Sequence, residues 1–560
     1  MSKAVGLPAL SVILIGFVAS TSAPLQAATN SLIVHTASGS VRGHLAQEVY
    51  SFKGIPFAAA PVGSLRWRAP APVHAWSGVR DASHYGPPCA QAAFDWNRAV
   101  AAESREDCLY LNVWVPQRRD GKPLPVIVFF PGGAYHGGSA RGFSAIEPSY
   151  DGARLARRDV IVVSANYRLG MFGFLAHPEL TAESPWHSSG NYALMDNIAA
   201  LQWVQANIGR FGGDPRNATA LGQSAGAWSV QLLMTSPLAR GLFARAIVQS
   251  GPVISDRPGQ PGLHDAEAAG VMFAKGLGAP KTGAIAELRR RSAQDLLDIM
   301  MTHPKLLSTE PKIVVVDGYV LPQQPALVFR AGHEMAIPMI IGSTARDGDF
   351  ASMGVSGTPK AAAAVADRTR TLATRHKVLP LSAGEAEEIR NFYASDADLA
   401  RRALNQYRDV SSADPADGDL ITAFYTDIVM RCGSSLIARL HARIAPTWQF
   451  EFSHGYEPLG AVHLWDMLYV FGWLQPPADQ ARDTRLVEEV QQYWTTFARS
   501  GNPNSAALPN WPQSNSRGMY LDFASESTSA KAGLRKASCA LYAQRTGQAL
   551  DELARGQTTH

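Results

Sequence analysis

The stretch Gly222-Gln223-Ser224-Ala225-Gly226 is the only G-x-S-x-G pentapeptide in the chain, and the expected fold is built around it. A serine in this pattern stands on a sharp strand-to-helix turn, which exposes its hydroxyl above a sheet. The flanks agree, since residues 218–221 form a short apolar run typical of a strand and residues 225–234 show helical periodicity. An ordinary glycine–serine turn is the alternative interpretation of these five residues.

Further apolar runs that are typical of buried strands alternate with helical patterns along the chain. The predicted strands are residues 125–130, 160–163, 218–221, 246–248, 337–341 and 448–452, and a predicted helix covers 195–208. This alternation predicts an α/β fold with a mostly parallel central sheet and helices on both faces. Ligands bind beyond the carboxyl ends of such strands, where the turns at Gly132-Gly133 and Ser224 are expected. The alanine- and charge-rich stretch 360–417 is expected to be helical and to form part of an inserted cap region.

The composition sets limits on function. The 560 residues are 46% hydrophobic and 18% charged, which supplies enough apolar material for a large core. The net charge is only +4 and the basic residues are scattered, so the sequence predicts no nucleic-acid partner. Neither C-x-x-C nor H-x-x-x-H occurs, and we therefore expect no metal site.

The first 27 residues have the layout of a secretory signal peptide. Lys3 precedes an apolar stretch at 4–19, and small residues follow at 20–28, with cleavage expected near Ala27. A membrane anchor is the alternative, but the apolar run is short for a span and no charged residue closes it. We therefore expect a secreted or periplasmic protein without stable membrane insertion after cleavage, in which residues 28–560 form one domain. The sequence leaves the oligomeric state open.

The chain contains four cysteines, at Cys89, Cys108, Cys432 and Cys539. An even count in a chain expected in an oxidising compartment predicts two disulfides. Three pairings are possible for four cysteines, and their spacing alone does not select one.

An activated serine needs a base, and the base needs an orienting acid. In hydrolases built on such a turn, they follow one another in the order serine, acid, histidine. Asp347 and Asp349 both follow the strand expected at 337–341, so either is a candidate acid. His454 and His463 both lie beyond the last predicted strand, and the residues alone leave that choice open as well.

The negative charge that develops on an attacked carbonyl oxygen needs backbone N–H donors nearby. Ala225 can supply one of them at the N-terminus of the predicted helix. The segment Gly132-Gly133-Ala134, which follows the strand expected at 125–130, would supply the others. A plain turn is the alternative interpretation of the two adjacent glycines.

Several longer segments match one family, in the same order, along nearly the whole mature chain. They are Phe52–Ala58 (FKGIPFA), Glu106–Val113 (EDCLYLNV), Asn166–Gly170 (NYRLG), Phe211–Pro215 (FGGDP) and Val470–Gly472 (VFG). On these motifs the chain resembles the type-B carboxylesterases, the α/β-hydrolase branch that includes cholinesterases and bacterial nitrobenzyl esterases. The resemblance implies an α/β-hydrolase fold and a carboxylic ester hydrolase that needs no cofactor.

The resemblance also implies which residues carry the chemistry. Asp347 falls where the family has its catalytic acid, and His463 falls on the family's catalytic histidine, so that both would serve Ser224. The resemblance assigns the oxyanion hole to the N–H groups of Gly133, Ala134 and Ala225.

The resemblance extends to residues around this site. Ser250 matches a serine often found behind the acid, where it would be a possible hydrogen-bond donor to it. The family's cysteine pattern would pair Cys89 with Cys108 and Cys432 with Cys539.

The chain departs from the family's pattern close to the expected site. Asp347 stands where most relatives have a glutamate, and Gln223 replaces a glutamate that would place a carboxylate near the histidine. Leu464 replaces a glycine and Asp466 another glutamate. Pro131, at the end of the oxyanion strand, lacks an N–H, but the expected donors keep theirs. We expect these departures to affect substrate preference more than mechanism.

The expected reaction is hydrolysis of small-molecule esters, apolar or aromatic, through an acyl-enzyme on Ser224, with His463 moving the proton. Candidate pocket-lining residues are Tyr135, Trp228, Phe350 and Trp473, for which core packing is the alternative. A second hypothesis is a non-catalytic cholinesterase-like binding protein, but such chains typically lose a triad member. A third hypothesis keeps the triad and changes the bond to an amide, a thioester or a lactone.

Overall fold

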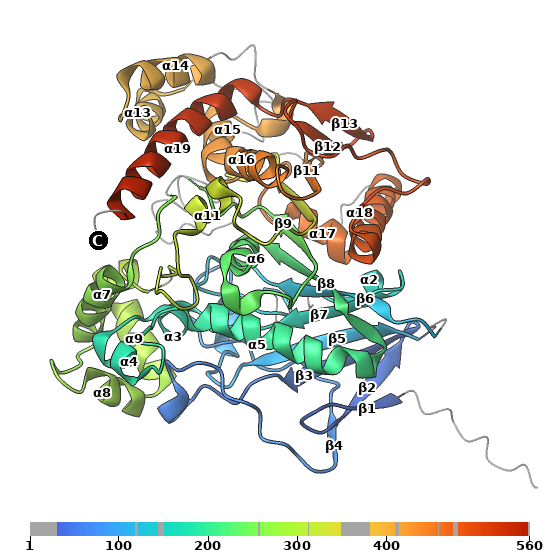
Figure 1. Ribbon diagram of the computed structural model, residues 1–560, viewed down its shortest axis with the longest axis vertical. Helices are drawn as coiled ribbons and strands as arrows, with labels where there is room; N and C mark the ends of the chain where they lie inside the picture. Colours follow the sequence, from blue (N-terminus) through green and yellow to red (C-terminus); the bar gives the residue numbers. More distant parts are fainter. Residues whose placement is uncertain are drawn as a thin grey trace, which may run out of the picture.

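The computed structural model describes residues 31–117, 121–143, 150–255, 258–311, 313–348, 381–408, 414–456, 459–473 and 480–557 (Figure 1). The expected signal peptide at 1–27, the candidates Asp349 and Phe350, and the part of the expected cap that precedes residue 381 lie outside the described residues.

The described strands form one sheet. They are β1 (Ser31–His35), β2 (Ser40–Ala46), β3 (Val49–Pro56), β4 (Val79–Asp81), β5 (Tyr110–Pro116), β6 (Leu124–Phe130), β7 (Ile161–Ala165), β8 (Gly213–Gln223), β9 (Arg245–Gln249), β10 (Met339–Thr344), β11 (Thr447–Phe452), β12 (Met519–Phe523) and β13 (Thr528–Ala532). Their order is β1-β2-β3-β5-β7-β6-β8-β9-β10-β11-β12-β13, and β4 pairs with β2. Neighbours from β7 to β12 along this path are parallel, and the pairs at both ends are antiparallel. The expected mostly parallel centre is therefore confirmed.

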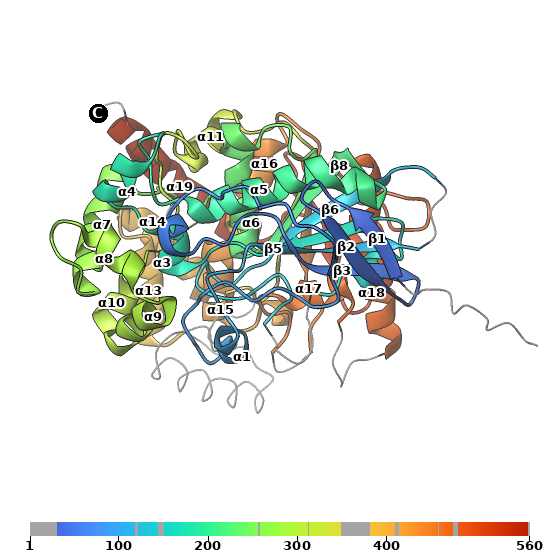
Figure 2. The ribbon, with the colours of Figure 1, turned by 90° about the horizontal axis from the view of Figure 1, so that it is seen from below.

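The described helices cover the sheet and extend beyond it. They are α1 (Arg98–Ala102), α2 (Ala153–Ala156), α3 (Gly170–Phe174), α4 (Pro178–Glu183), α5 (Tyr192–Asn207), α6 (Ala225–Thr235), α7 (Leu263–Gly276), α8 (Ala284–Arg290), α9 (Ala293–Thr302), α10 (Pro304–Ser308), α11 (Pro325–Ala331), α13 (Ala383–Phe392), α14 (Ala397–Arg408), α15 (Leu420–Thr426), α16 (Cys432–His441), α17 (Trp465–Phe471), α18 (Gln480–Ser500) and α19 (Lys536–Gln557). A π-helical turn at Asp427–Arg431 joins α15 to α16. Helices α7 to α10 gather at the end of the molecule opposite β1 and β2 (Figure 2).

Strand β6 shows why the sequences of the central strands are continuously apolar. Val126 and Val128 belong to a hydrophobic core that also contains residues of α5 and α6. Ile127 and Phe129 belong to a second core that contains residues of α2, α17 and α18. Because alternate side chains of a strand point to opposite faces, a strand covered by helices on both sides must be apolar throughout.

A third hydrophobic core lies at the top of Figure 1, where α13 and α14 pack with α15 and α19. The disulfide between Cys432 and Cys539 joins α16 to α19 within this core. The run Leu420–His441, which spans α15 to α16, is long and apolar enough to cross a membrane, but 83% of its apolar 18-residue stretch is buried. It is therefore placed as a core helix of the fold.

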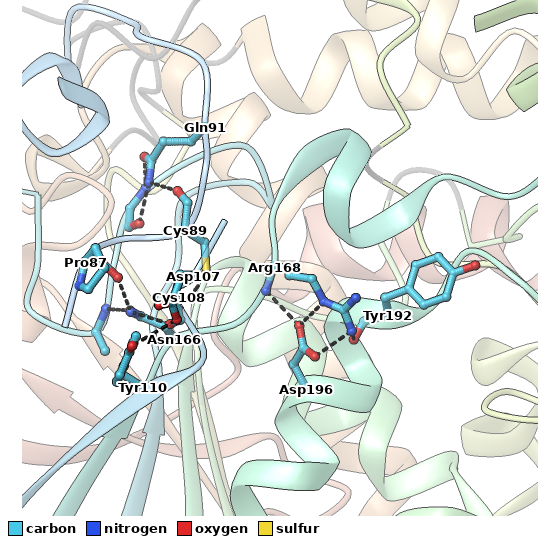
Figure 3. The surroundings of a disulfide bond; sticks show 12 residues. Pro87, Cys89, Gln91, Asp107, Cys108, Tyr110, Asn166, Arg168, Tyr192 and Asp196 are labelled. Carbon is cyan, nitrogen blue, oxygen red and sulfur yellow. Dashed lines mark hydrogen bonds and ion pairs between the residues drawn. A yellow bond between two sulfur atoms is a disulfide. The ribbon is translucent and has the colours of Figure 1, made fainter. Parts of the chain in front are cut away.

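The second disulfide joins Cys89 to Cys108, so that both pairings implied by the resemblance are present (Figure 3). Asn166 donates from Nδ2 to the carbonyl oxygens of Pro87 and Cys108, at 3.0 and 3.1 Å. The same side chain accepts the N–H of Ala140 at 2.8 Å. The motif residues Cys108 and Asn166 therefore hold together loops that follow β6 and β7.

Candidate active site

Ser224 lies on a strained turn between the last residue of β8 and the first residue of α6. Its backbone has φ 55° and ψ −124°, a conformation that costs free energy for a residue with a Cβ atom. A Cβ at Gly222 would lie 2.2 Å from the carbonyl oxygen of Gly226, and one at Gly226 would lie 2.0 Å from that of Phe130. Both glycines are thus required, and the N–H of Ser224 donates to the Gln249 carbonyl oxygen at 2.8 Å.

Asp347 and His463 meet behind this turn. His463 Nδ1 lies 2.5 Å from Oδ1 of Asp347, and both side chains are buried. The other carboxylate oxygen, Oδ2, accepts the N–H of Thr344 at 3.0 Å. An ionised carboxylate only accepts hydrogen bonds, so Nδ1 of His463 carries the proton and Nε2 is left unprotonated in the neutral ring.

The Nε2 edge of the imidazole faces the turn that carries Gln223 and Ser224. Nε2 of His463 lies 3.2 Å from Nε2 of Gln223, the residue that directly precedes Ser224. His454, the other candidate, lies instead against Ser525 Oγ at 2.8 Å and Asp483 Oδ1 at 3.0 Å. The structure therefore brings Asp347 and His463 to the turn that carries Ser224 and places His454 in a separate cluster.

The loop that carries Asp347 is held by buried side chains from α15 to β11. Arg431, which is fully buried, donates from Nη2 to the carbonyl oxygen of Ala345 at 2.7 Å. The N–H of Gly348 donates to Thr426 Oγ1 at 2.9 Å. Arg431 also forms ion pairs at 2.7 Å with each of three carboxylates, those of Asp417, Asp427 and Glu451.

The turn that carries two of the expected oxyanion donors, Gly133 and Ala134, follows β6 and lies next to Ser224. A Cβ at Gly132 would lie 2.8 Å from Cβ of Ser224, so the turn after β6 packs directly against the serine. Among the described residues, the N–H groups of Gly133, Ala134 and Ala225 donate to no acceptor. Ala225 is the first residue of α6, where the helix dipole favours negative charge.

A cavity of about 350 Å³ lies against α6, the helix that follows Ser224. Trp228 lines it from the first turn of α6, where its N–H donates to the Ser224 carbonyl oxygen at 3.0 Å. Tyr135, which follows the expected oxyanion donors, also lines it, with its ring centroid 6.2 Å from that of Trp228. The remaining apolar lining includes Leu232, Val253, Pro261, Ile313 and Val314.

Trp473, another predicted pocket residue, does not line this cavity in the described part of the chain. Its N–H donates to the Leu468 carbonyl oxygen at 2.8 Å. Phe350 lies outside the described residues.

Comparisons with known proteins identify the family of the chain. The model of the carboxylesterase family matches residues 30–542. The chain belongs to the carboxylesterase family. A fumonisin B1 esterase from Sphingopyxis macrogoltabida is 36% identical over 90% of this chain and 89% of that protein. Liver carboxylesterase 1F from Rattus norvegicus is 33% identical, over 87% of this chain and 89% of that protein.

Solved structures of esterases share the fold. A thermophilic PNB esterase superposes with a TM-score of 0.73 at 30% identity, covering 91% of this chain and 99% of that one. The resemblance to the α/β-hydrolase carboxylesterases is therefore confirmed, and the chain is a carboxylic ester hydrolase.

Behind its Asp347–His463 pair, this carboxylesterase buries further polar groups. Ser250 has a positive φ of 54°, and its Oγ has no hydrogen-bond partner among the described residues. Its expected role as a donor to the acid thus stays a prediction. Asp466 accepts a hydrogen bond from Nε2 of Gln249 at 2.6 Å. Burial and the neighbouring negative charge of Asp347 raise the pKa of Asp466 to about 7.

Sequence reasoning missed the partners that hold these side chains. Gln249, which directly precedes Ser250, connects Asp466 to Nε1 of Trp494. Arg431 anchors the loop that carries Asp347. Asp466 was noticed only as a departure from the family's pattern. Its position three residues after His463, on the first turn of a helix, is the signal that points to it.

Proposed function

We propose that this carboxylesterase hydrolyses apolar or aromatic esters through a triad of Ser224, His463 and Asp347. The observation that carries the proposal is the position of the imidazole. Its Nδ1 is bound by Asp347, and its Nε2 faces the turn that carries the strained Ser224. This is the arrangement that lets a histidine take a proton from a serine hydroxyl.

In the first half of the reaction, Ser224 Oγ attacks the ester carbonyl carbon while its proton moves to Nε2 of His463. The carbonyl electron pair moves onto oxygen, and the resulting oxyanion accepts hydrogen bonds from Gly133, Ala134 and Ala225. When the carbonyl re-forms, the bond to the alkoxy group breaks, and the leaving alcohol takes the proton from His463. The acyl group is then bonded to Ser224.

In the second half, a water molecule replaces the alcohol. His463 accepts one proton of the water as its oxygen attacks the acyl carbon, and the same oxyanion donors stabilise the second tetrahedral intermediate. Collapse of that intermediate releases the carboxylic acid, and the proton returns from His463 to Ser224. Asp347 keeps the ring in its productive tautomer and stabilises the imidazolium that forms in both halves.

The cavity lined by Tyr135 and Trp228 supports the proposal of an apolar substrate group. Its volume of about 350 Å³ is at the lower end of the range of ligand cavities. The wall is formed mainly by aromatic and aliphatic side chains, among them Tyr135, Trp228, Leu232 and Val314. We therefore expect it to hold the apolar acyl or alkoxy group of one small ester rather than a charged group.

The proposal includes the place of action. The two disulfides fit an oxidising compartment, and the signal-type sequence at 1–27 fits export, so we expect a secreted or periplasmic enzyme. The full chain and residues 28–560 would each be expressed in a bacterium. N-terminal sequencing of the full-chain product would give the mature N-terminus. Esterase activity measured in separated cell fractions would show the compartment of each protein.

The test of the function is a chain-length series of nitrophenyl esters given to the purified mature protein and to Ser224→Ala. We expect turnover by the wild type that is lost in Ser224→Ala. Trp228→Ala should shift the preferred acyl length toward longer chains, because it enlarges the cavity. Amide, thioester and lactone substrates tested on the same preparation would show whether esters are preferred. Equal turnover by wild type and Ser224→Ala would contradict the proposal.

A further inference from the structure

We propose that a buried pair, His136 and Glu310, positions the oxyanion turn, defined here as residues 131–137, so that Glu310 is a positioning residue for ester hydrolysis. The inference rests on the proposed function, since it concerns how the donors Gly133 and Ala134 are held. It assigns a role to two residues that lie outside the triad and outside the motifs of the sequence.

The oxyanion turn has a backbone that needs support. Ala134 and Tyr135 have φ of 52° and 59°, in the left-handed region that residues with a Cβ atom disfavour. The carbonyl oxygen of Gly133 accepts the N–H groups of His136 and Gly137 at 2.9 and 3.1 Å, which closes the turn on itself. Two successive disfavoured residues persist only where the surrounding structure holds them.

Glu310 supplies that hold from outside the turn. Its Oε2 lies 2.7 Å from Nδ1 of His136, and its Oε1 accepts the N–H of Met171 at 3.2 Å. Only 4% of the Glu310 side chain and 14% of the His136 side chain is exposed, so solvent screens the contact weakly. Gly170 makes room for the carboxylate, because a Cβ there would lie 2.1 Å from Oε1.

The contacts form a closed ring around the turn. The N–H of Gly170 donates to the carbonyl oxygen of Tyr135 at 2.7 Å. Glu310 therefore holds the turn twice, directly through His136 and indirectly through the Gly170–Met171 segment that binds Tyr135. Displacing the carboxylate would release both restraints, and the N–H groups of Gly133 and Ala134 would lose their fixed direction.

The segment of Glu310 also reaches the cavity. Ile313 and Val314, a few residues farther along the chain, line the same cavity as Tyr135 and Trp228. The same carboxylate therefore ties the cavity wall to the oxyanion turn. A small displacement of catalytic groups is costly, because reaction requires the donors and the reacting atoms to be aligned at the moment of attack.

The test compares Glu310→Ala and Glu310→Gln with a matched control. Glu334 pairs with His441 through a buried contact of 2.8 Å, so Glu334→Ala removes a similar pair that contacts no residue assigned to the site. Titration with diethyl nitrophenyl phosphate counts reactive serines, and kcat is then expressed per reactive site. We expect Glu310→Ala to lower kcat by roughly 10- to 100-fold, with little change in KM.

Three further readouts separate positioning from a merely structural role. Glu310→Gln, which keeps an oxygen for the Met171 N–H, should recover part of the lost kcat. Affinity for a trifluoromethyl ketone, which forms an oxyanion on Ser224, should fall with kcat/KM in Glu310→Ala. Affinity for the methyl ketone of the same shape should stay unchanged. Glu334→Ala should keep the wild-type kcat per reactive site.

Two outcomes would overturn the inference. One is a wild-type kcat per reactive site in Glu310→Ala, which would make the pair structural. The other is an equal loss of affinity for both ketones, which would indicate a changed cavity rather than a changed oxyanion hole. A wild-type protein that hydrolyses no ester and is not titrated would instead contradict the proposed function, and the inference would fall with it.

Discussion

Nδ1 of His463 lies 2.5 Å from Oδ1 of Asp347, whereas His454, from the same connection between β11 and α17, lies against Asp483. The two histidine–aspartate pairs have similar chemistry, and both are buried. They differ in what the second ring nitrogen meets. In His463, Nε2 is the nitrogen that does not contact the aspartate, and it faces Gln223 on the serine turn. In His454, the corresponding nitrogen is Nδ1, and it contacts Ser525 Oγ.

The first prediction uses this difference. His463→Ala should lower kcat for a nitrophenyl ester by at least roughly 10⁴-fold, because the serine loses its general base. His454→Ala is the matched control and should keep kcat per titrated serine, although its stability should fall. Steady-state kinetics normalised by active-site titration measures both. A loss of activity confined to His454→Ala would reverse the assignment.

The second prediction concerns the glutamine before the serine. Gln223→Glu would place a carboxylate beside Nε2 of His463, where Gln223 Nε2 now lies at 3.2 Å. An adjacent negative charge favours the protonated imidazole, which cannot act as a base. The acid limb of the kcat/KM profile should therefore move to higher pH, by roughly one pH unit.

The control for this shift is Gln294→Glu, which adds the same charge on the exposed surface of α9. It should leave the pH profile unchanged. The interpretation of Gln223 as a neighbour of the catalytic base would be contradicted if Gln223→Glu and Gln294→Glu gave the same profile as the wild type.

The third prediction is a pH-dependent stability. The pKa of Asp466 is raised from 3.8 to about 7, mainly by burial. Between these values the folded protein keeps a proton that the unfolded chain has released, so the free energy of unfolding falls as the pH rises. The whole loss is on the order of 4 kcal/mol, at 1.36 kcal/mol for each pKa unit.

Asp466→Asn removes this loss, because an amide does not ionise and still offers an oxygen to Gln249. The variant should match the wild type most closely near pH 4 and be more stable than it at pH 8. Urea unfolding followed by tryptophan fluorescence at both pH values measures the difference. An equal difference between the two proteins at pH 4 and pH 8 would rule out the titration of Asp466 as its cause.

The fourth prediction concerns the anchor of the acid loop. Arg431→Met leaves three buried carboxylates without their shared cation and frees the carbonyl oxygen of Ala345. Breaking one buried ion pair by removing a partner costs about 3–5 kcal/mol, and the free energy of unfolding should fall by at least that much.

The comparison for Arg431 is Arg330→Met. Arg330 pairs with Asp551 on the surface, where 42% and 58% of the two side chains are exposed. Exposed pairs contribute about 0–1 kcal/mol, so this variant should unfold almost as the wild type does. Similar denaturation midpoints for Arg330→Met and Arg431→Met would show that the buried network is not important for stability.

The sequence predicted the central strands because both faces of the sheet are covered. The run Val126–Phe130 is apolar at every position for that reason, and it was assigned without reference to its neighbours. Strands β12 and β13 were not predicted. Met519–Phe523 contains an aspartate, and Thr528–Ala532 is largely exposed with mixed polarity, so their strand conformation depends on pairing with β11 and with each other.

The candidate site was predictable in part. The G-x-S-x-G pattern located Ser224 because the turn geometry needs glycine at two fixed positions. The residues alone did not distinguish His463 from His454, because long-range packing decides which of them meets Asp347. The His136–Glu310 pair joins residues 174 positions apart, and no local pattern marks it.

The most direct test of the proposed chemistry is covalent labelling of the nucleophile. Diisopropyl fluorophosphate phosphorylates an activated serine with loss of fluoride, and mass spectrometry of the digested protein locates the adduct. We predict one adduct per chain, on the peptide that carries Ser224, with loss of ester hydrolysis in proportion to labelling. An adduct on another residue, or full ester hydrolysis after Ser224 is labelled, would contradict the assignment of Ser224 as the nucleophile.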